Sequence, residues 1–193
     1  MPRSHHEPHA TDAVALLKRD HAAVKKLFAR FEEAPDTDKQ ALAERICKML
    51  TIHATIEEEI FYPAARAALT DEELLDEAEV EHGSAKELIA KIEAMRVGQP
   101  KFDANVVVLG EYIDHHVKEE HNELFPKVRR ARLDLERLGQ LLAARKEQLM
   151  SELGLDGEGD AAEVRSARRP RRKSTRRSLR KTVKARRSRR AQR

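Results

Sequence analysis

Apolar residues recur every three or four positions through most of this chain, which is the period of one face of an α-helix. One such stripe covers residues 14–31 and a second covers residues 42–60. Pro35 separates the two stripes and Pro63 follows the second, with a short helical continuation to Leu69 left open. We therefore expect two amphipathic helices in the first third of the chain.

The same pattern continues in two further stripes, over residues 74–92 and 103–124. Residues 70–73, Thr-Asp-Glu-Glu, are typical of a helix start, and Pro126 is expected to end or kink the fourth helix. A fifth amphipathic stretch covers residues 128–153. Four long helices joined by short breaks are typical of an up-down-up-down bundle.

The sequence thus predicts an all-α fold, with a four-helix bundle over residues 11–131 and an extra C-terminal helix over residues 132–153. Residues 1–10 are polar and are expected to form a disordered leader. No segment approaches the roughly 18 uncharged apolar residues that cross a bilayer. Because there is no apolar leader and Cys47 is the single cysteine, we expect a cytoplasmic protein without membrane insertion.

Charge divides the chain into an acidic body and a basic tail. Of the 38 Lys and Arg residues, 16 lie in Arg165–Arg193, which contains no Asp or Glu. Residues 1–164 contain the other 22 and all 34 acidic residues, which gives this segment a net charge of −12. The tail has almost no large apolar residues, so we predict that residues 154–193 are a linker and a disordered basic tail. Such a tail binds DNA or RNA non-specifically. A solvated tail, or one that folds back on the acidic body, stays an alternative.

A histidine occupies the middle of each of the four apolar stripes. These histidines are His21, His53, His82 and His116. One such residue is most simply a core histidine with a local hydrogen bond. Antiparallel packing of four helices, however, would bring all four to one level of the core.

The chain also contains an internal repeat. Residues 20–32 return as residues 81–93, so that His21 corresponds to His82 at an offset of 61. The second and fourth helices match at an offset of 63, which aligns two His-x3-Glu motifs that are each followed by an aromatic residue and a proline. Residues i and i+4 project from one face of a helix, so each motif aims an imidazole and a carboxylate at one point.

The two hairpins would together present four histidines and two glutamates to the core. We take these as the candidate metal ligands: His21, His53, Glu57, His82, His116 and Glu120. Two carboxylates in an apolar core are costly unless cations compensate them, and mixed imidazole and carboxylate ligands favour Fe, Mn or Zn. The alternative is that both glutamates are solvated and the repeat reflects ancestry alone.

These motifs are similar to those of the hemerythrin-like (HHE cation-binding) family, over residues 12–131. The resemblance implies a four-helix bundle with two iron ions in a non-haem di-iron centre, which binds dioxygen, nitric oxide or peroxide. Oxygen-carrying hemerythrins have His-x3-His on the third helix, whereas here Lys86 follows His82. They end with His-x4-Asp, whereas this chain has His-x3-Glu. The missing imidazole implies reactivity or sensing rather than reversible oxygen carriage.

Other polar residues near the motifs are weaker candidates. His115 and His121 lie off the apolar stripe and are expected at the surface or beside the ligands. Three glutamates could hydrogen-bond the ligand imidazoles: Glu58, Glu79 and Glu119. Tyr112 lies one turn before His116 and could face the site.

We therefore expect a protein that binds or senses iron, oxygen or a reactive oxygen or nitrogen species. Two alternatives stay open: a di-iron enzyme of peroxidase, catalase-like or ferroxidase type, and a nucleoid-associated structural protein with a metal-free bundle. Ferritin-like sites use two Glu-x-x-His motifs. This chain has that motif at Glu79 and His82, and the other half of the repeat has no second copy of it. The sequence therefore disfavours the ferritin arrangement.

Overall fold

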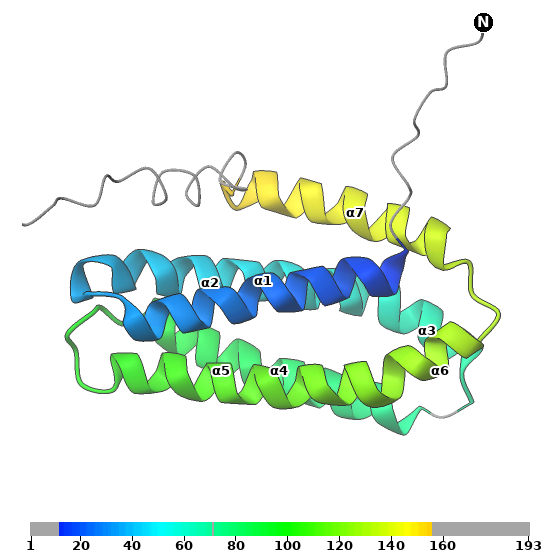
Figure 1. Ribbon diagram of the computed structural model, residues 1–193, viewed down its shortest axis with the longest axis horizontal. Helices are drawn as coiled ribbons and strands as arrows, with labels where there is room; N and C mark the ends of the chain where they lie inside the picture. Colours follow the sequence, from blue (N-terminus) through cyan, green and yellow to red (C-terminus); the bar gives the residue numbers. More distant parts are fainter. Residues whose placement is uncertain (1–11, 71, 156–193) are drawn as a thin grey trace, which may run out of the picture. The chain divides into compact units, whose positions relative to one another are not determined.

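The computed structural model describes residues 12–70 and 72–155, and in these residues every regular element is a helix (Figure 1). The predicted leader and the predicted basic tail lie outside the described residues. The elements in chain order are α1 (Ala13–Glu33), α2 (Asp36–Ile56), η1 (Glu57–Phe61), α3 (Tyr62–Ala68), α4 (Glu73–Glu93), α5 (Phe102–Glu119), η2 (Glu120–Leu124), α6 (Phe125–Arg130) and α7 (Leu135–Glu152).

Two antiparallel hairpins form the bundle. The first hairpin, residues 13–68, pairs α1 with α2 and its continuation, and the second hairpin, residues 73–130, pairs α4 with α5 and its continuation. The hairpins pack together through α1 against α5 and α2 against α4 (Figure 1). The predicted all-α bundle is therefore confirmed.

The bundle core consists of two apolar clusters with a polar layer between them. On α1, for example, residues 13–17 belong to one cluster and residues 24–31 to the other, with His21 between the two. His82 separates the two clusters in the same way on α4. Along the antiparallel helices the order is reversed: His53 lies where α2 passes from one cluster to the other, and His116 lies between Leu109 of α5 and Leu124 of η2. The helical stripes therefore bring all four histidines to one level of the bundle.

Two π-helical turns interrupt the long helices at equivalent points of the repeat. In η1 the Tyr62 N–H donates to the Glu57 carbonyl, and in η2 the Phe125 N–H donates to the Glu120 carbonyl. Each π turn lies just before a proline. A proline has no N–H and its ring collides with the carbonyl four residues earlier, and a wider turn relieves that collision. The fourth helix therefore continues through Pro126 as α6 instead of ending there.

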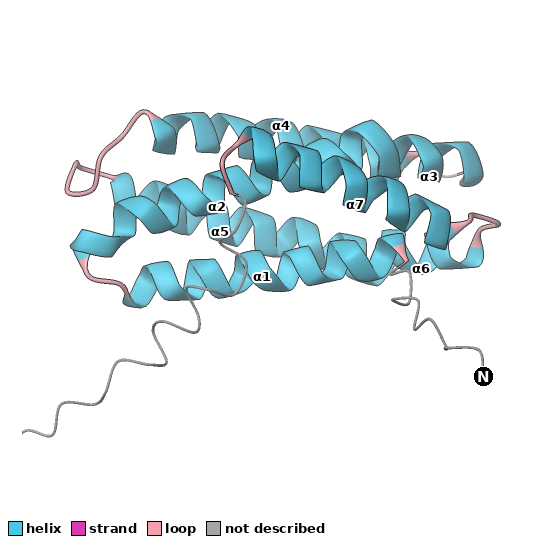
Figure 2. Cartoon of the chain, turned by 90° about the horizontal axis from the view of Figure 1, so that it is seen from above, coloured by secondary structure: helices cyan, strands magenta, loops and turns pink. Residues whose placement is uncertain are grey.

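The fifth helix begins later than the apolar pattern predicts. Val128 belongs to α6, and α7 starts at Leu135, where the Asp134 carboxylate accepts a hydrogen bond from the Arg137 N–H at 2.9 Å. Helix α7 packs on α1, α2 and η1, and it buries Leu142 in the apolar cluster at that end (Figures 1 and 2). Its most extensive contacts are therefore with the first hairpin.

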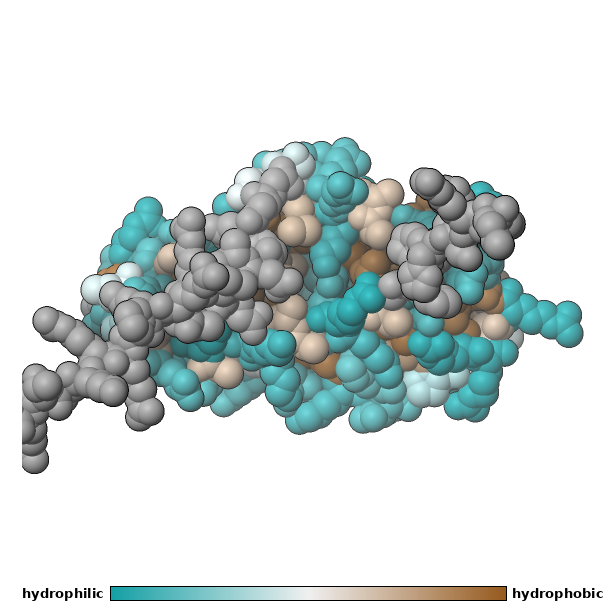
Figure 3. Space-filling model, turned by 45° about the horizontal axis from the view of Figure 1, so that its top comes forward, coloured by the Kyte–Doolittle hydropathy of each residue, from teal (hydrophilic) through white to brown (hydrophobic). Residues whose placement is uncertain are grey.

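The helix starts differ in how their backbone N–H groups are satisfied. The Asp12 carboxylate accepts a hydrogen bond from the Ala15 N–H at 2.8 Å and caps α1. Glu72 precedes α4 without such a side-chain bond. Polar side chains cover most of the surface seen in Figure 3, with apolar ones between them. None of the helices among the described residues is long and apolar enough to cross a membrane.

Candidate metal centre

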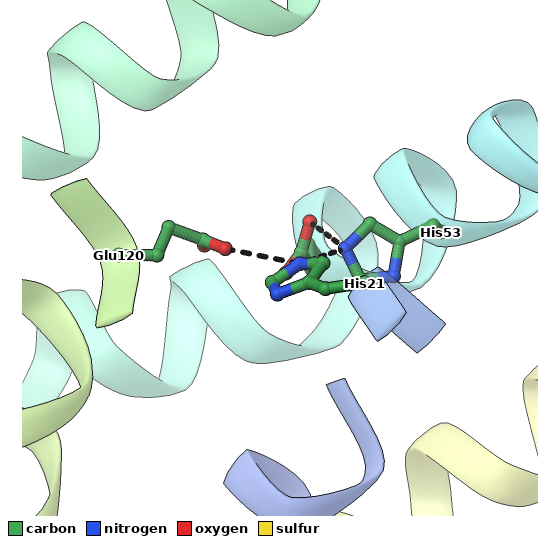
Figure 4. Close-up of side chains that lie close together, drawn as sticks. His21, His53 and Glu120 are labelled. Atoms are coloured by element: carbon green, nitrogen blue, oxygen red, sulfur yellow. Dashed lines mark hydrogen bonds and ion pairs between the residues drawn. The ribbon is translucent and has the colours of Figure 1, made fainter. Parts of the chain in front are cut away.

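The structure brings all six candidate ligands into one buried cluster, with none of them more than 7% exposed. His21 lies at its centre: its Nε2 is 2.7 Å from His53 Nε2 and 3.3 Å from Glu120 Oε2. Figure 4 shows Glu120 and His53 approaching His21 from opposite sides. One histidine from each helix of the first hairpin thus meets a carboxylate from the second hairpin.

The other two histidines form the matching pair. His82 Nε2 lies 3.2 Å from His116 Nε2. Glu57 Oε2 is 3.2 Å from His53 Nε2 and 3.5 Å from His82 Nε2, so that Glu57 faces one imidazole from each hairpin. Glu120 Oε2 does the same, at 3.3 Å from His21 and 3.8 Å from His116. Both carboxylates therefore lie between two pairs of imidazoles, as bridging ligands would.

The Nδ1 atom of each imidazole faces outward toward a polar partner. The four pairs are His21 with His121 Nε2 at 3.0 Å, His53 with Asp20 Oδ2 at 3.7 Å, His82 with Glu58 Oε1 at 3.0 Å and His116 with Glu81 Oε2 at 2.7 Å. Partners of this kind fix the ring orientation and present the Nε2 lone pair to a metal.

These outer partners follow the repeat. Asp20 and Glu81 occupy equivalent positions, just before the first histidine of each hairpin, and each contacts the histidine on the next helix of the same hairpin. Glu58 and His121 are also equivalent, and each supports the first histidine of the opposite hairpin. The two hairpins are therefore interlocked through their outer hydrogen bonds.

Burial and close charges shift the pKa values of the cluster strongly. Burial raises the pKa of Glu120 well above its usual range, and the charge of Glu57 raises it further. Burial would lower the pKa of His53, but the charges of Glu57 and Asp20 outweigh it and raise this pKa to about 10. Burial and the neighbouring His53 lower the pKa of His21 to about 2. Without a cation, the cluster must hold protons to balance its carboxylates.

Three buried carboxylate oxygens of the cluster have no hydrogen-bond partner, and a metal would satisfy them. They are both oxygens of Glu57 and Glu120 Oε2. Unsatisfied buried carboxylate oxygens are costly, and coordination to a cation is the usual compensation. The ligand atoms form two groups, and within each group all atoms lie within 4.8 Å of one another. The first group comes from His21, His53, Glu57 and Glu120, and the second from Glu57, His82 and His116. The donor set fits two transition-metal ions that share a carboxylate.

Tyr62 also contacts the cluster, although the sequence pattern does not predict it. Its phenol donates to Glu120 Oε1 at 3.2 Å and lies 3.4 Å from His82 Nε2. Tyr62 follows Glu57 by five residues, a spacing that points away from the site in a regular α-helix but toward it across a π turn. Tyr62 is the aromatic residue before the proline that follows the first His-x3-Glu motif, whereas Tyr112 is the tyrosine that the sequence pattern places near the site.

The weaker candidates fall into three places. Glu58 and His121 contact ligand imidazoles, as described above. Glu79 accepts a hydrogen bond from Arg66 on the surface, at 3.0 Å. His115 and Glu119 pair with each other outside the buried cluster, with His115 Nε2 3.2 Å from Glu119 Oε1.

A groove between α1 and α5 leads to the cluster. Its volume is about 620 Å³, and it is lined by apolar side chains, by lysines and acids at the rim, and by His21 and His121. Phe28 forms part of its wall, and a Cβ on Gly110 would lie 3.1 Å from the Phe28 ring. A small molecule in this groove would reach the His21 side of the cluster.

Comparison with known proteins agrees with this geometry. The model of the family described as the hemerythrin HHE cation-binding domain matches residues 12–128. A crystal structure of an HHE domain-containing protein from Mycobacterium kansasii, a homologue of Rv2633c, superposes with a TM-score of 0.65 at 28% identity, covering 80% of this chain and 98% of that one. The uncharacterized protein Rv2633c of Mycobacterium tuberculosis is 28% identical over 143 residues, 72% of this chain and 87% of that protein.

A further relative has a longer chain. A DNA nickase from Nostoc sp. is 32% identical over 118 residues, which are 59% of this chain. The chain spans about a third of the length of that nickase, 32%.

Proposed function

The chain belongs to the hemerythrin HHE cation-binding family, and we propose that its buried cluster holds two iron ions as a non-haem di-iron centre. In this proposal His21 and His53 would hold one ion, His82 and His116 would hold the other, and Glu57 and Glu120 would supply the carboxylate oxygens. The observation that carries it is the pair of buried, unsatisfied carboxylates between two pairs of imidazoles.

The proposed role is to bind or sense dioxygen, nitric oxide or peroxide. Bound iron would supply the redox change and the affinity for such ligands. The groove beside His21 and His121 supports the proposal, because it offers a route from the surface to one side of the cluster. Lys86, which follows His82 by four residues, directs its Nζ to Glu58 at 2.6 Å and 2.7 Å and not to the cluster. The chain therefore contributes no fifth histidine at this point.

Metal analysis with visible spectroscopy tests this function. Protein loaded with ferrous iron under argon should hold two ions per chain and should develop near-ultraviolet charge-transfer bands when air is admitted. Decay of these bands would favour oxidation or sensing over oxygen carriage. Absence of stoichiometric metal and of any bands would reject the di-iron centre.

Tyr62 favours a second candidate function, the decomposition of peroxide. Its phenol contacts both Glu120 and His82 and is fully buried, so it can donate a hydrogen bond or a proton inside the cluster. A catalase-like reaction would convert two hydrogen peroxide molecules into two water molecules and one dioxygen. Oxygen evolution by the iron-loaded protein, lost in Tyr62→Phe with iron content unchanged, would support it. The surface position of Glu79 gives no support to a ferritin-like ferroxidase arrangement.

We also propose that Arg165–Arg193 associates with nucleic acid without sequence preference. The support is its charge, 16 Lys and Arg with no acid, and the similarity of the bundle to a protein named as a DNA nickase. Truncation after Asp156 should abolish retention of DNA in a gel at low salt and leave the iron content intact. DNA binding that survives truncation would reject the role of the tail. DNA binding that survives replacement of all six ligands would favour a nucleoid-associated structural protein.

A further inference from the structure

The second hairpin carries a group of three metal-ligating side chains outside the buried cluster. Glu81, His115 and Glu119, here called the outer trio, each offer a ligand atom, and the three atoms lie within 4.8 Å of one another. His115 Nε2 is 3.2 Å from Glu119 Oε1 and 3.8 Å from Glu81 Oε1. The His115 side chain is 64% exposed, so an ion in solution can reach the trio.

The equivalent positions of the first hairpin carry apolar residues. At the offset of 63, His115 corresponds to Ile52 and Glu119 to Ile56, which are both buried in the apolar cluster that α7 joins. Helix α7 thus covers one hairpin with apolar contacts, whereas the equivalent face of the other presents an imidazole and a carboxylate. The repeat does not require these two polar residues, because its other copy has isoleucines.

The charge balance differs in the same way. Asp20, the equivalent of Glu81, forms an ion pair with Lys146 of α7. Glu81 is 9% exposed and faces two imidazoles instead, with Oε2 on His116 Nδ1 and Oε1 toward His115. A divalent cation at the outer trio would supply the positive charge that Lys146 supplies to Asp20.

A small cavity borders both the outer trio and the buried cluster. Its volume is about 10 Å³, close to the smallest space that holds one water. The polar groups that line it are Glu81 and Glu119 from the trio and His116 and Glu120 from the cluster. Glu120 Oε2 is among the buried atoms without a hydrogen-bond partner. The cavity is thus lined by carboxylates from both the outer trio and the buried cluster.

We propose that the outer trio is a second metal site, which captures a divalent first-row cation and passes it through the cavity to the buried centre. This inference rests on the proposed function, because the relay needs a metal centre to fill. Histidine nitrogen with two carboxylate oxygens suits iron(II), manganese(II), cobalt(II) or zinc(II), and the two carboxylates attract the cation from solution.

Cobalt(II) alone, whose visible absorption changes on ligation, is a suitable probe for the full-length protein. The test variant is His115→Ala with Glu119→Gln, which leaves Glu81 on His116. Glu87→Gln, an exposed acid on α4 of the same hairpin, is the matched control. Equilibrium dialysis gives the number of bound ions, and stopped-flow absorption at limiting cobalt gives the rate at which the buried centre fills.

The wild type and the control should bind two ions tightly and a third more weakly. The test variant should lose the third ion and fill the buried centre about tenfold more slowly, with the same two ions bound at the end. Retention of the third ion would overturn the outer site, and an unchanged filling rate would overturn the relay. Failure of the di-iron proposal gives a different result: no tightly bound ion in any of the three proteins.

Discussion

The two hairpins of the bundle supply equivalent inner ligands but different outer partners. Glu58 of the first hairpin corresponds to His121 of the second, and Tyr62 corresponds to Phe125. Each of these residues contacts a histidine of the opposite hairpin. His82 is contacted by the Glu58 carboxylate and the Tyr62 phenol. His21 is contacted by the His121 imidazole, and the Phe125 ring lies 6.0 Å from it between centroids. The His21 side also adjoins the groove.

This difference implies that two metal ions in the cluster would not be equivalent. A carboxylate on Nδ1 makes an imidazole a stronger ligand, and Glu58 is itself held by Lys86. Burial and the charge of Lys18 lower the pKa of His121, so at neutral pH it is an uncharged partner of His21. The His82 side is thus the more tightly held one, and the His21 side is the one suited to exchange and to external ligands.

The largest expected effect is the loss of bound metal when a carboxylate that faces histidines of both hairpins is removed. Glu57→Ala should remove both ions, because Glu57 faces His53 of one side and His82 of the other. Metal analysis after gel filtration measures this, with Glu123→Ala, an exposed acid in η2, as the control. Retention of one ion by Glu57→Ala would show that this carboxylate serves a single side.

The second prediction concerns the packing of α7 on the first hairpin. Leu142 of α7 is fully buried, so Leu142→Ala should lower the free energy of unfolding by about 2–5 kcal/mol. Leu141 is 50% exposed, and Leu141→Ala should change it by less than about 0.5 kcal/mol. Urea unfolding of both variants measures the difference. Equal stability would mean that α7 does not pack on the first hairpin in solution.

The third prediction concerns pH. Since the pKa of His53 is raised to about 10 and that of Glu120 is also raised, the metal-free cluster holds protons at pH 7 that a metal must displace. Metal binding therefore releases protons, and affinity falls as pH falls, by about tenfold per pH unit for each proton released. Zinc titrations between pH 7 and pH 5 should show a loss of about a hundredfold or more. A constant affinity would contradict the histidine and carboxylate ligand set.

The smallest effect compares the outer partners directly. Glu58→Gln should weaken one of the two ions by about tenfold, because His82 loses its carboxylate. His121→Gln should have less effect, since it replaces one neutral partner of His21 with another. Competition with a chelator separates the two binding steps. A larger loss in His121→Gln would reverse the assignment of the stronger side.

The fold and the six inner residues could be predicted because their information is local. Each histidine lies in its own stripe, and each glutamate follows a histidine by one helical turn. Tyr62 could not be placed in this way, because its direction depends on the π turn at η1. Val128 was assigned to the wrong helix for a similar reason, since the chain continues helically through Pro126.

The outer partners required the tertiary structure. Asp20 and Glu81 precede the first histidine of each hairpin, but each contacts a histidine on the next helix. The repeat contained their equivalence, yet an acidic residue on a helix is most often solvated. Only the packed bundle shows that both carboxylates lie behind an imidazole.

The different outer partners of the two hairpins mean that the bundle has no exact twofold symmetry. Two identical hairpins related by a twofold axis must give both ions the same surroundings. Joining the hairpins in one chain removes this requirement, because a substitution in one copy then changes only one side. Tyr62 without a second tyrosine, and Glu58 without a second glutamate, are two such substitutions. A covalent link between the halves would thus allow one of two bound ions to be held firmly while its neighbour exchanges.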